Sequence, residues 1–175
     1  MLVYAGIGSR QISNEEAIFC KTAASILAER GWTLRSGGAD GADSAFESGC
    51  DLKNGSKEIY LPWKMFNGNK SPLYNVTKSA YDIAKEFHPN YAKLLMGAAK
   101  LIARDSYQIL GSDLKSLVKF VLYCADEDAS GNVKGGTGQA IRIAKYFKIP
   151  TYNIRSICNS IKVNRYIELL LKEVK

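Results

Sequence analysis

The sequence predicts a Rossmann-like α/β fold, a three-layer sandwich built around a mostly parallel sheet. Short apolar runs alternate with amphipathic stretches along the chain, and three glycine-rich loops each follow an expected strand and precede an expected helix. This alternation is typical of parallel strands joined by right-handed crossovers. The chain of 175 residues is long enough for one hydrophobic core. We therefore expect a single domain over residues 1–175, with a sheet of about five or more strands.

The first third of the chain predicts alternating strands and helices. An apolar run ended by a glycine indicates a buried first strand, and the capping-box pattern SNEE, which begins at Ser13, indicates the start of the first helix. Gly31 is typical of a helix end. The expected strands cover residues 2–6, 32–36 and 58–61, and the expected helices cover 13–31 and the stretch from the second glycine-rich loop to about residue 49.

The rest of the chain continues the pattern less regularly. We expect helices over residues 79–87, 91–102 and 135–147, a strongly apolar strand over 117–125, a strand over 150–154, and a last helix from about 159 to the end. A polar loop is expected at 126–134. The last helix has apolar residues at Ile167, Leu170 and Leu171. They serve either as an interface or to pack on the sheet.

The composition favours an anionic partner. The formal net charge is +7, which favours nucleotides, nucleic acid or acidic surfaces, although a basic protein that is merely soluble has the same charge. No apolar run approaches the roughly 18 residues that a membrane helix needs. The first residues carry no basic segment typical of a signal peptide. We expect a cytoplasmic protein without membrane contacts.

Metal or cofactor chemistry is not indicated by the cysteines or the histidine. The four cysteines form no CxxC pair and have apolar neighbours, so we expect buried free thiols. His88 is the single histidine and cannot build a histidine-rich zinc site. We therefore predict no metal site and no resident cofactor.

The three glycine-rich loops, residues 6–10, 36–43 and 135–138, are the candidate ligand site. In a parallel sheet they lie at the carboxyl ends of strands, where doubly wound folds bind ligands. Glycine lets the backbone approach a phosphate, and a helix N-terminus offers unpaired N–H donors. The third loop contains no acidic residue and is flanked by Lys134 and Arg142. It is therefore the best candidate for a phosphate-binding site, and Arg10 is a candidate to bind the same phosphate.

A group of carboxylates follows the second loop, because Asp40, Asp43 and Glu47 are spaced at i, i+3 and i+7. One interpretation is that they stay solvated and stabilise the start of the helix. The other is that one or two of them bind ribose hydroxyls or act as acid or base. Asp40 is the better placed for this second role, because it lies in the loop itself.

Further along, each polar or aromatic candidate has two interpretations. Arg104, Asp105 and Gln108 either read the edge of a base or form a surface turn. Trp63 and Tyr107 either stack on a base or pack in the core.

Three motifs together resemble the SMF/DprA-LOG superfamily. They are residues 4–10 (YAGIGSR), 36–43 (SGGADGAD) and 135–138 (GGTG). The chain is similar to short, single-domain DprA-like proteins of phages. The resemblance implies a Rossmann-like fold, a nucleotide-derived ligand and a homo-oligomer. The residues that it places around the ligand are Gly8, Ser9, Arg10, Gly37, Gly38, Gly135, Gly136, Thr137 and Gly138. From the second motif we add Ser36, Asp40 and Asp43 as candidate ligand residues.

The superfamily contains several functional classes. LOG-type members are phosphoribohydrolases that cleave the base from a nucleoside monophosphate. Other members are sensor domains for ADP-ribose-type signals, and DprA binds single-stranded DNA and loads a recombinase. The resemblance alone leaves all of these classes open.

One position departs from the LOG pattern. LOG enzymes have the pattern PGGxGTxxE at the third motif, and its glutamate is catalytic. When the glycines are aligned with Gly135, Gly136 and Gly138, this chain has Arg142 at the position of the glutamate. A guanidinium cannot accept a proton from water or a hydrogen bond from ribose. This favours a protein that does not catalyse LOG-type hydrolysis. Asp40 and Glu47 are the candidate catalytic residues for the alternative, an N-glycosidic hydrolase acting on nucleotides.

The sequence thus favours binding of a nucleotide or nucleotide-derived signal, such as an ADP-ribose derivative or a cyclic nucleotide. We expect its phosphate on residues 135–138 with help from Ser9 and Arg10, and its ribose facing Asp40 or Asp43. In a phage such a protein would sequester a defence signal inside the host. The second alternative is DprA-like binding of single-stranded DNA in recombination.

Overall fold

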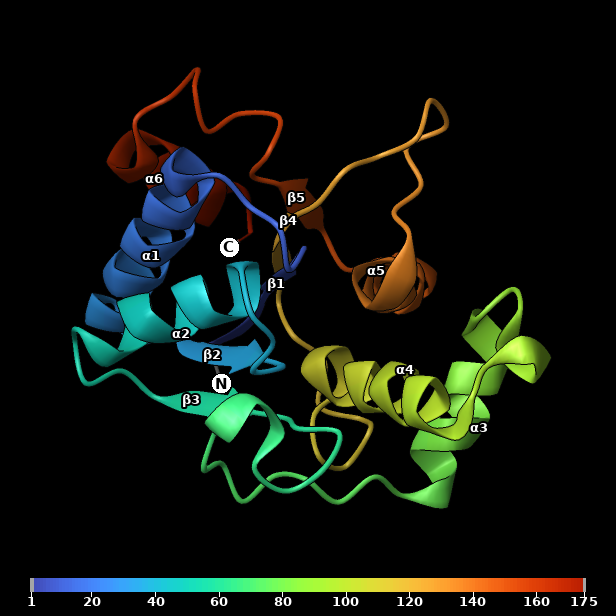
Figure 1. Cartoon of the computed structure of the whole chain (residues 1–175). Coiled ribbons are helices and arrows are strands. Elements are labelled where there is room, and N and C mark those ends of the chain that lie inside the picture. The colour runs from blue at the N-terminus through green and yellow to red at the C-terminus, as the bar shows by residue number, and fades with distance from the viewer. Residues whose placement is uncertain (1, 175) are drawn as a thin grey trace.

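The computed structural model describes residues 2–174 and confirms the Rossmann-like α/β class. Five parallel strands form one sheet in the order β3-β2-β1-β4-β5 (Figure 1). The strands are β1 (Val3–Gly8), β2 (Thr33–Ser36), β3 (Lys57–Ile59), β4 (Val121–Cys124) and β5 (Thr151–Asn153).

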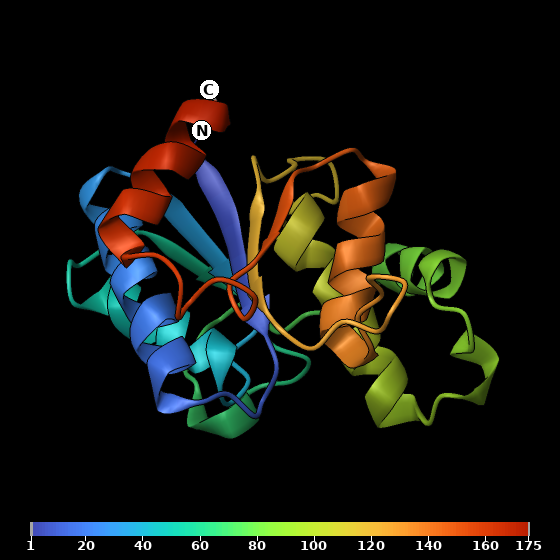
Figure 2. The ribbon, with the colours of Figure 1, turned by 90° about the horizontal axis from the view of Figure 1, so that it is seen from above.

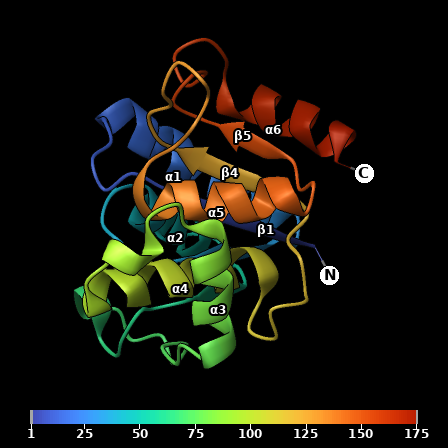
Figure 3. The ribbon, with the colours of Figure 1, turned by 90° about the vertical axis from the view of Figure 1, so that its right-hand side faces the viewer.

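Helices cover both faces of the sheet, which Figure 2 shows between the two helical layers. One layer holds α1 (Asn14–Glu29), α2 (Ala42–Asp51) and α6 (Val163–Glu173). The other layer holds α3 (Lys78–Phe87), α4 (Met96–Leu110) and α5 (Gly135–Tyr146), which lie in front of the sheet in Figure 3. Short 3₁₀ turns cover Phe66–Gly68 and Tyr91–Lys93.

The strand order places a topological switch point between β1 and β4. The chain begins at β1, builds β2 and β3 outward on one side, and returns through α3 and α4 to place β4 on the other side of β1. Ala5 of β1 pairs with Arg35 of β2 and with Val121 of β4. Ligands of open parallel sheets bind at such a point, beyond the carboxyl ends of the strands.

Each helical layer has its own hydrophobic core. Tyr4, Phe120 and Phe46 of α2 are buried in the core on one side of the sheet. Ile109 of α4 and Ile143 of α5 are buried in the core on the other side. The predicted capping box of α1 is present, because Ser13 and Glu16 bond to one another's backbone N–H. The four cysteines are free, as predicted, and Cys20, Cys50 and Cys124 are buried. Cys158 is only partly buried, which differs from the expectation.

The last helix packs inside the domain. Ile167 and Leu170 of α6 are buried in the same core as α1, so the apolar face of α6 contributes to folding. This observation decides between the two interpretations of that face. Within residues 2–174, no helix combines the length and the apolar composition needed to cross a membrane.

The largest correction to the predicted elements concerns α4. The helix expected over residues 91–102 is a 3₁₀ turn followed by a helix from Met96 to Leu110. The helix continues because Ala103 and Ile109 are buried, and it ends at Gly111, which has a φ of 76°. Arg104 and Asp105 are therefore buried helical residues, and the surface-turn interpretation is wrong. Other boundaries shift by a few residues, as with α6, which begins at Val163 instead of 159.

Candidate functional site

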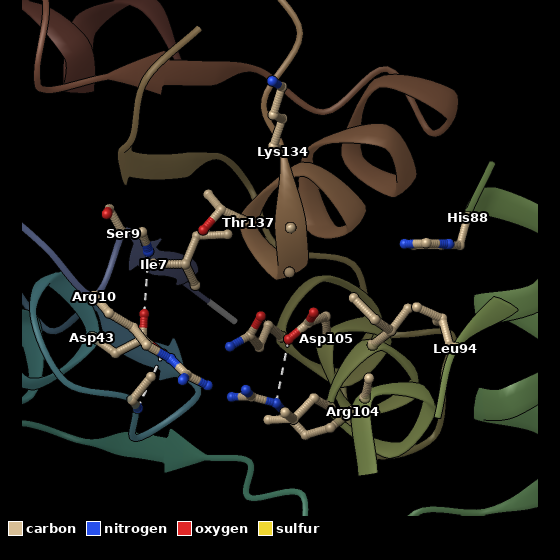
Figure 4. A pocket seen from close by; sticks show the side chains of 18 residues that line it. Ile7, Ser9, Arg10, Asp43, His88, Leu94, Arg104, Asp105, Lys134 and Thr137 are labelled. Atoms are coloured by element: carbon tan, nitrogen blue, oxygen red, sulfur yellow. Dashed lines mark hydrogen bonds and ion pairs between the residues drawn. The ribbon is translucent and has the colours of Figure 1, made fainter. Parts of the chain in front are cut away.

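A cavity of about 420 Å³ lies beyond the carboxyl ends of β1 and β4. Its volume falls in the range of roughly 300–1,000 Å³ that small-molecule sites occupy. Its walls come from the end of β1 and the loop after it, the start of α2 with the loop before it, the N-terminus of α5, and α4 with the turn before it. His88, at the end of α3, completes the lining. Figure 4 shows Arg10 and Asp43 on one side and Arg104 and Asp105 on the other, with Lys134 and Thr137 above them.

The N-terminus of α5 faces this cavity without a side-chain cap. Gly135, Gly136 and Thr137 line the cavity, and the N-cap residue Lys134 makes no capping hydrogen bond through its side chain. Among the described residues, none accepts a hydrogen bond from the backbone N–H of these three residues. Gly135 has a φ of 67°, a conformation that favours glycine. The helix therefore presents unpaired donors and the positive end of its dipole to the cavity.

The loop after β1 is held rigidly at the cavity floor. The backbone N–H of Ser9 donates to the carbonyl of Cys124 at 2.7 Å, and the N–H of Ala42 donates to the carbonyl of Ser9 at 3.0 Å. A Cβ on Gly8 would lie 2.4 Å from the Cys124 carbonyl oxygen, so only glycine fits there. Arg10 follows directly and also lines the cavity. The glycine at position 8 thus determines the path of the loop that carries Arg10, the residue expected to bind the phosphate.

Asp43 connects the first two glycine-rich loops. Its Oδ1 accepts from the N–H of Gly8 at 3.1 Å, and its Oδ2 accepts from the N–H of Ala39 at 3.3 Å. The side chain is buried, and this burial raises the pKa of Asp43 to about 6, although Arg104 and the backbone donors oppose the shift. Both carboxylate oxygens are occupied by backbone donors, so Asp43 positions the loops.

Asp105 is the carboxylate that has free capacity in the cavity. Its Oδ1 lies 3.3 Å from Nε of Arg104, and its buried Oδ2 has no hydrogen-bond partner among the described residues. A Cβ on Gly136 would lie 2.8 Å from this Oδ2, which places the oxygen against the first turn of α5. Burial raises the pKa of Asp105 to about 7; Arg104 opposes this shift and Asp43 adds to it.

Part of the cavity wall is apolar. It consists of Leu94, Ala98, Leu101 and Ile102, and Ile7 adds to the lining from β1. His88 also lines the cavity and lies above Leu94 in Figure 4. One end of the cavity therefore offers N–H donors and cations, while another offers an apolar surface.

Seven of the predicted ligand residues line this single cavity. They are Gly8, Ser9, Arg10, Asp43, Gly135, Gly136 and Thr137. The structure thus brings the first and third loops together with one carboxylate from the second motif.

The other predicted residues lie outside the lining. Ser36 is buried and donates to the carbonyl of Gly6 at 2.7 Å, whereas Asp40 is exposed. Glu47 accepts from Lys57 at 2.8 Å and from Asn69 at 2.9 Å in a separate groove. Three glycines also fall outside the lining: Gly37, Gly38 and Gly138.

The aromatic candidates do not reach the cavity. Tyr107 is buried and stacks on Tyr60 with ring centroids 5.5 Å apart. It therefore packs in the core, which is one of the two interpretations that the sequence left open. Trp63 is partly exposed and packs edge-on against Phe66. Instead, residues of α4 that the sequence left between two interpretations, Arg104, Asp105 and Gln108, line the cavity. The signal for Asp105 is its spacing from Ala98 and Leu101, which places all three on one face of α4.

Arg142 lies about two turns inside α5 and has a structural role there. Its Nε donates to the carbonyl of Phe87 at 2.7 Å, and its Nη2 donates to Oε1 of Gln139 at 2.9 Å. The bond to Phe87 joins α5 to the end of α3, and the bond to Gln139 lies within α5. The guanidinium thus occupies the position where the LOG pattern has its catalytic glutamate.

No protein-family model matches the chain, and a search of curated proteins finds no significant match. Among solved structures, the chain is similar to DNA processing protein A from Helicobacter pylori, described with a single-stranded DNA binding mode, at a TM-score of 0.62 and 18% identity. That match covers 98% of this chain and 81% of the other. DNA processing protein A from Streptococcus pneumoniae matches at a TM-score of 0.52 and 17% identity, covering 98% of this chain and 56% of the other.

A molybdenum cofactor carrier protein from Chlamydomonas reinhardtii also matches, at a TM-score of 0.47 and 14% identity, with coverage of 98% and 96%. The two DNA processing proteins match over almost the whole of this chain. The chain therefore shares the fold of these two DNA processing proteins.

Proposed function

We propose that the chain binds a nucleotide or nucleotide-derived ligand in the cavity between α4 and α5. The observation that carries this proposal is the uncapped N-terminus of α5, which faces a cavity of suitable volume with an apolar wall. The phosphate sits on the N–H groups of Gly135, Gly136 and Thr137, because a helix N-terminus attracts anions. Arg10 and Lys134 line the same cavity and add positive charge.

The base packs on the apolar wall of α4. Leu94, Leu101 and Ile102 offer a surface that suits a planar, weakly polar ring. The sugar then lies between this wall and α5. The ribose contacts expected from the sequence need revision here, because Asp40 is exposed and both oxygens of Asp43 bond to the backbone.

The ligand is held without cleavage in this proposal. Arg142 stands where the LOG pattern has its catalytic glutamate and is occupied by Phe87 and Gln139. A protein that keeps the binding cavity without this group would sequester a nucleotide-derived signal, such as an ADP-ribose derivative or a cyclic nucleotide. The test is mass spectrometry after incubation with a nucleotide mixture. Intact compound released only on denaturation supports sequestration, whereas free base that accumulates with time contradicts it.

Binding at this cavity is tested by calorimetry with nucleoside monophosphates, ADP-ribose and cyclic dinucleotides. We expect at least one of them to bind, and saturation at a hundredfold excess over Kd to stabilise the fold by about 2.7 kcal/mol. Lys134→Ala should weaken binding by about tenfold, because a charge-assisted contact contributes about 1.5 kcal/mol or more. The matched control is Lys21→Ala, which removes an exposed lysine of α1 on the other face of the sheet.

Single-stranded DNA is the second candidate ligand. It is favoured by the net charge of +7 and by the similarity to a protein described with a single-stranded DNA binding mode. An oligo-dT whose backbone contacts several cations should lose affinity steeply with salt. Tight binding of oligo-dT with such a slope, together with no binding of any small nucleotide, would favour this candidate over the first.

A further inference from the structure

Asp105 is in an unusual position for a carboxylate that borders a phosphate seat. It is 3% exposed, and its unpartnered Oδ2 points to the first turn of α5. The same turn carries the free N–H groups of Gly135, Gly136 and Thr137. An anion bound there lies next to this oxygen.

An ionised Asp105 would oppose such an anion. Two like charges about 4 Å apart repel strongly when water is excluded from the space between them. A protonated carboxyl has the opposite effect, because its O–H donates a hydrogen bond to an anionic oxygen. The protonation of Asp105 therefore decides whether the turn accepts an anion.

The surroundings of Asp105 contain charges of both signs. Asp43 from α2 is the neighbouring carboxylate, and Arg10, Arg104 and Arg142 are the neighbouring guanidiniums. Arg104 donates to the carbonyl of Tyr60 at 3.2 Å, and Arg142 donates to the carbonyl of Phe87, so both cations are shared with backbone groups. His88 and Lys134 line the same cavity.

We propose that the cavity takes up its phosphate ligand together with one proton, which Oδ2 of Asp105 holds and donates to an oxygen of the anion. This inference rests on the proposed nucleotide binding and specifies which ligands the cavity selects. It selects ligands with an anionic acceptor at the α5 turn and disfavours a neutral nucleoside. No covalent step occurs: free protein, ligand and one proton combine into the complex.

Proton-linked binding has a defined pH dependence. The free protein loses the proton as the pH rises through the pKa of Asp105, about 7. The bound anion holds the proton, so affinity is full at low pH and falls tenfold per pH unit above that value. Between pH 6 and pH 9 the Kd should rise on the order of 100-fold.

The test uses ADP-ribose and inorganic sulfate, because the charge of neither changes between pH 6 and pH 9. Calorimetry of the unaltered protein at pH 8, in two buffers of different ionisation enthalpy, should show an uptake of close to one proton. Asp105→Asn supplies an amide N–H that donates as the protonated acid does. This variant should bind as tightly as the original protein at pH 6 and keep that affinity at pH 9. Asp82→Asn, which removes an exposed carboxylate of α3, should leave the pH dependence unchanged.

The outcomes separate this inference from the proposed function. Failure of ADP-ribose and sulfate to bind the unaltered protein at pH 6 would count against both. Binding without proton uptake and with a constant Kd would overturn the inference and leave nucleotide binding intact. Loss of binding in a folded Asp105→Asn protein at pH 6 would also overturn it, because Asp105 would then act as an acceptor.

Discussion

Replacing Asp105 by asparagine should make the protein more stable at alkaline pH. Burial raises the pKa of this carboxyl from 3.8 to about 7 in the folded chain. The unfolded chain therefore releases the proton first, and the stability that the protonated form provides is lost as the pH rises through about 7. The part of this loss that falls between pH 5 and pH 8 is about 2 to 3 kcal/mol. Asparagine has no charge to bury and keeps that stability.

Urea unfolding at pH 5 and pH 8 measures this effect directly. The unfolding free energy of Asp105→Asn minus that of the unaltered protein should increase by about 2 to 3 kcal/mol between the two pH values. Asp43 titrates in both proteins, so most of its contribution cancels in this difference. Asp82→Asn is the surface control and should give a difference that hardly changes with pH. If the difference in unfolding free energy between Asp105→Asn and the unaltered protein were equal at pH 5 and pH 8, the inference that Asp105 is buried and holds a proton would be refuted.

Three further predictions concern two glycines and the assembly state. Gly136→Ala places a methyl group 2.8 Å from Oδ2 of Asp105, so we expect ADP-ribose binding to weaken at least about fivefold by calorimetry while the melting temperature changes little. Gly8→Ala places its Cβ 2.4 Å from the Cys124 carbonyl oxygen, which is backbone and cannot move aside, so urea unfolding should show a loss of about 3 kcal/mol or more. The implied homo-oligomer predicts at least twice the chain mass in light scattering, and a monomer at all concentrations would contradict it.

The glycine-rich loops could be predicted from the sequence because local backbone constraints require their glycines. Gly8 is required by a carbonyl of the neighbouring strand, and Gly135 by a positive φ. Gly8 ends β1 and Gly135 begins α5, the helix that follows β4, so the alternation of elements already places both at the carboxyl edge of the sheet. The sequence therefore predicted that the first and third loops meet, and both line the same cavity.

The positions of the carboxylates were harder to predict, because the prediction assumed helical spacing for a residue that lies before the helix. Asp40, Asp43 and Glu47 share a face only if all three are helical, but α2 begins at Ala42. Asp40 precedes the helix and is exposed, while Asp43 is drawn inward by two backbone donors. Glu47 lies one turn further along and pairs with Lys57, away from the cavity.

Asp105 was not assigned to the cavity because its neighbours are distant in sequence. It meets the α5 turn only after the crossover from β3 to β4 places α4 beside α5. The third motif contains no carboxylate of its own, yet the structure places one against Gly136. Pairings of this kind depend on tertiary packing, which residue spacing alone does not contain.

The central claim is that a nucleotide phosphate sits at the N-terminus of α5, and the most direct measurement is an NMR titration of ¹⁵N-labelled protein with ADP-ribose. Backbone amide shifts report which N–H groups gain an anionic acceptor. The account predicts the largest shift changes at Gly135, Gly136 and Thr137, with a second group at Ser9 and Arg10. Changes centred instead on the separate groove of Glu47 and Lys57, or none at saturating ligand, would contradict it.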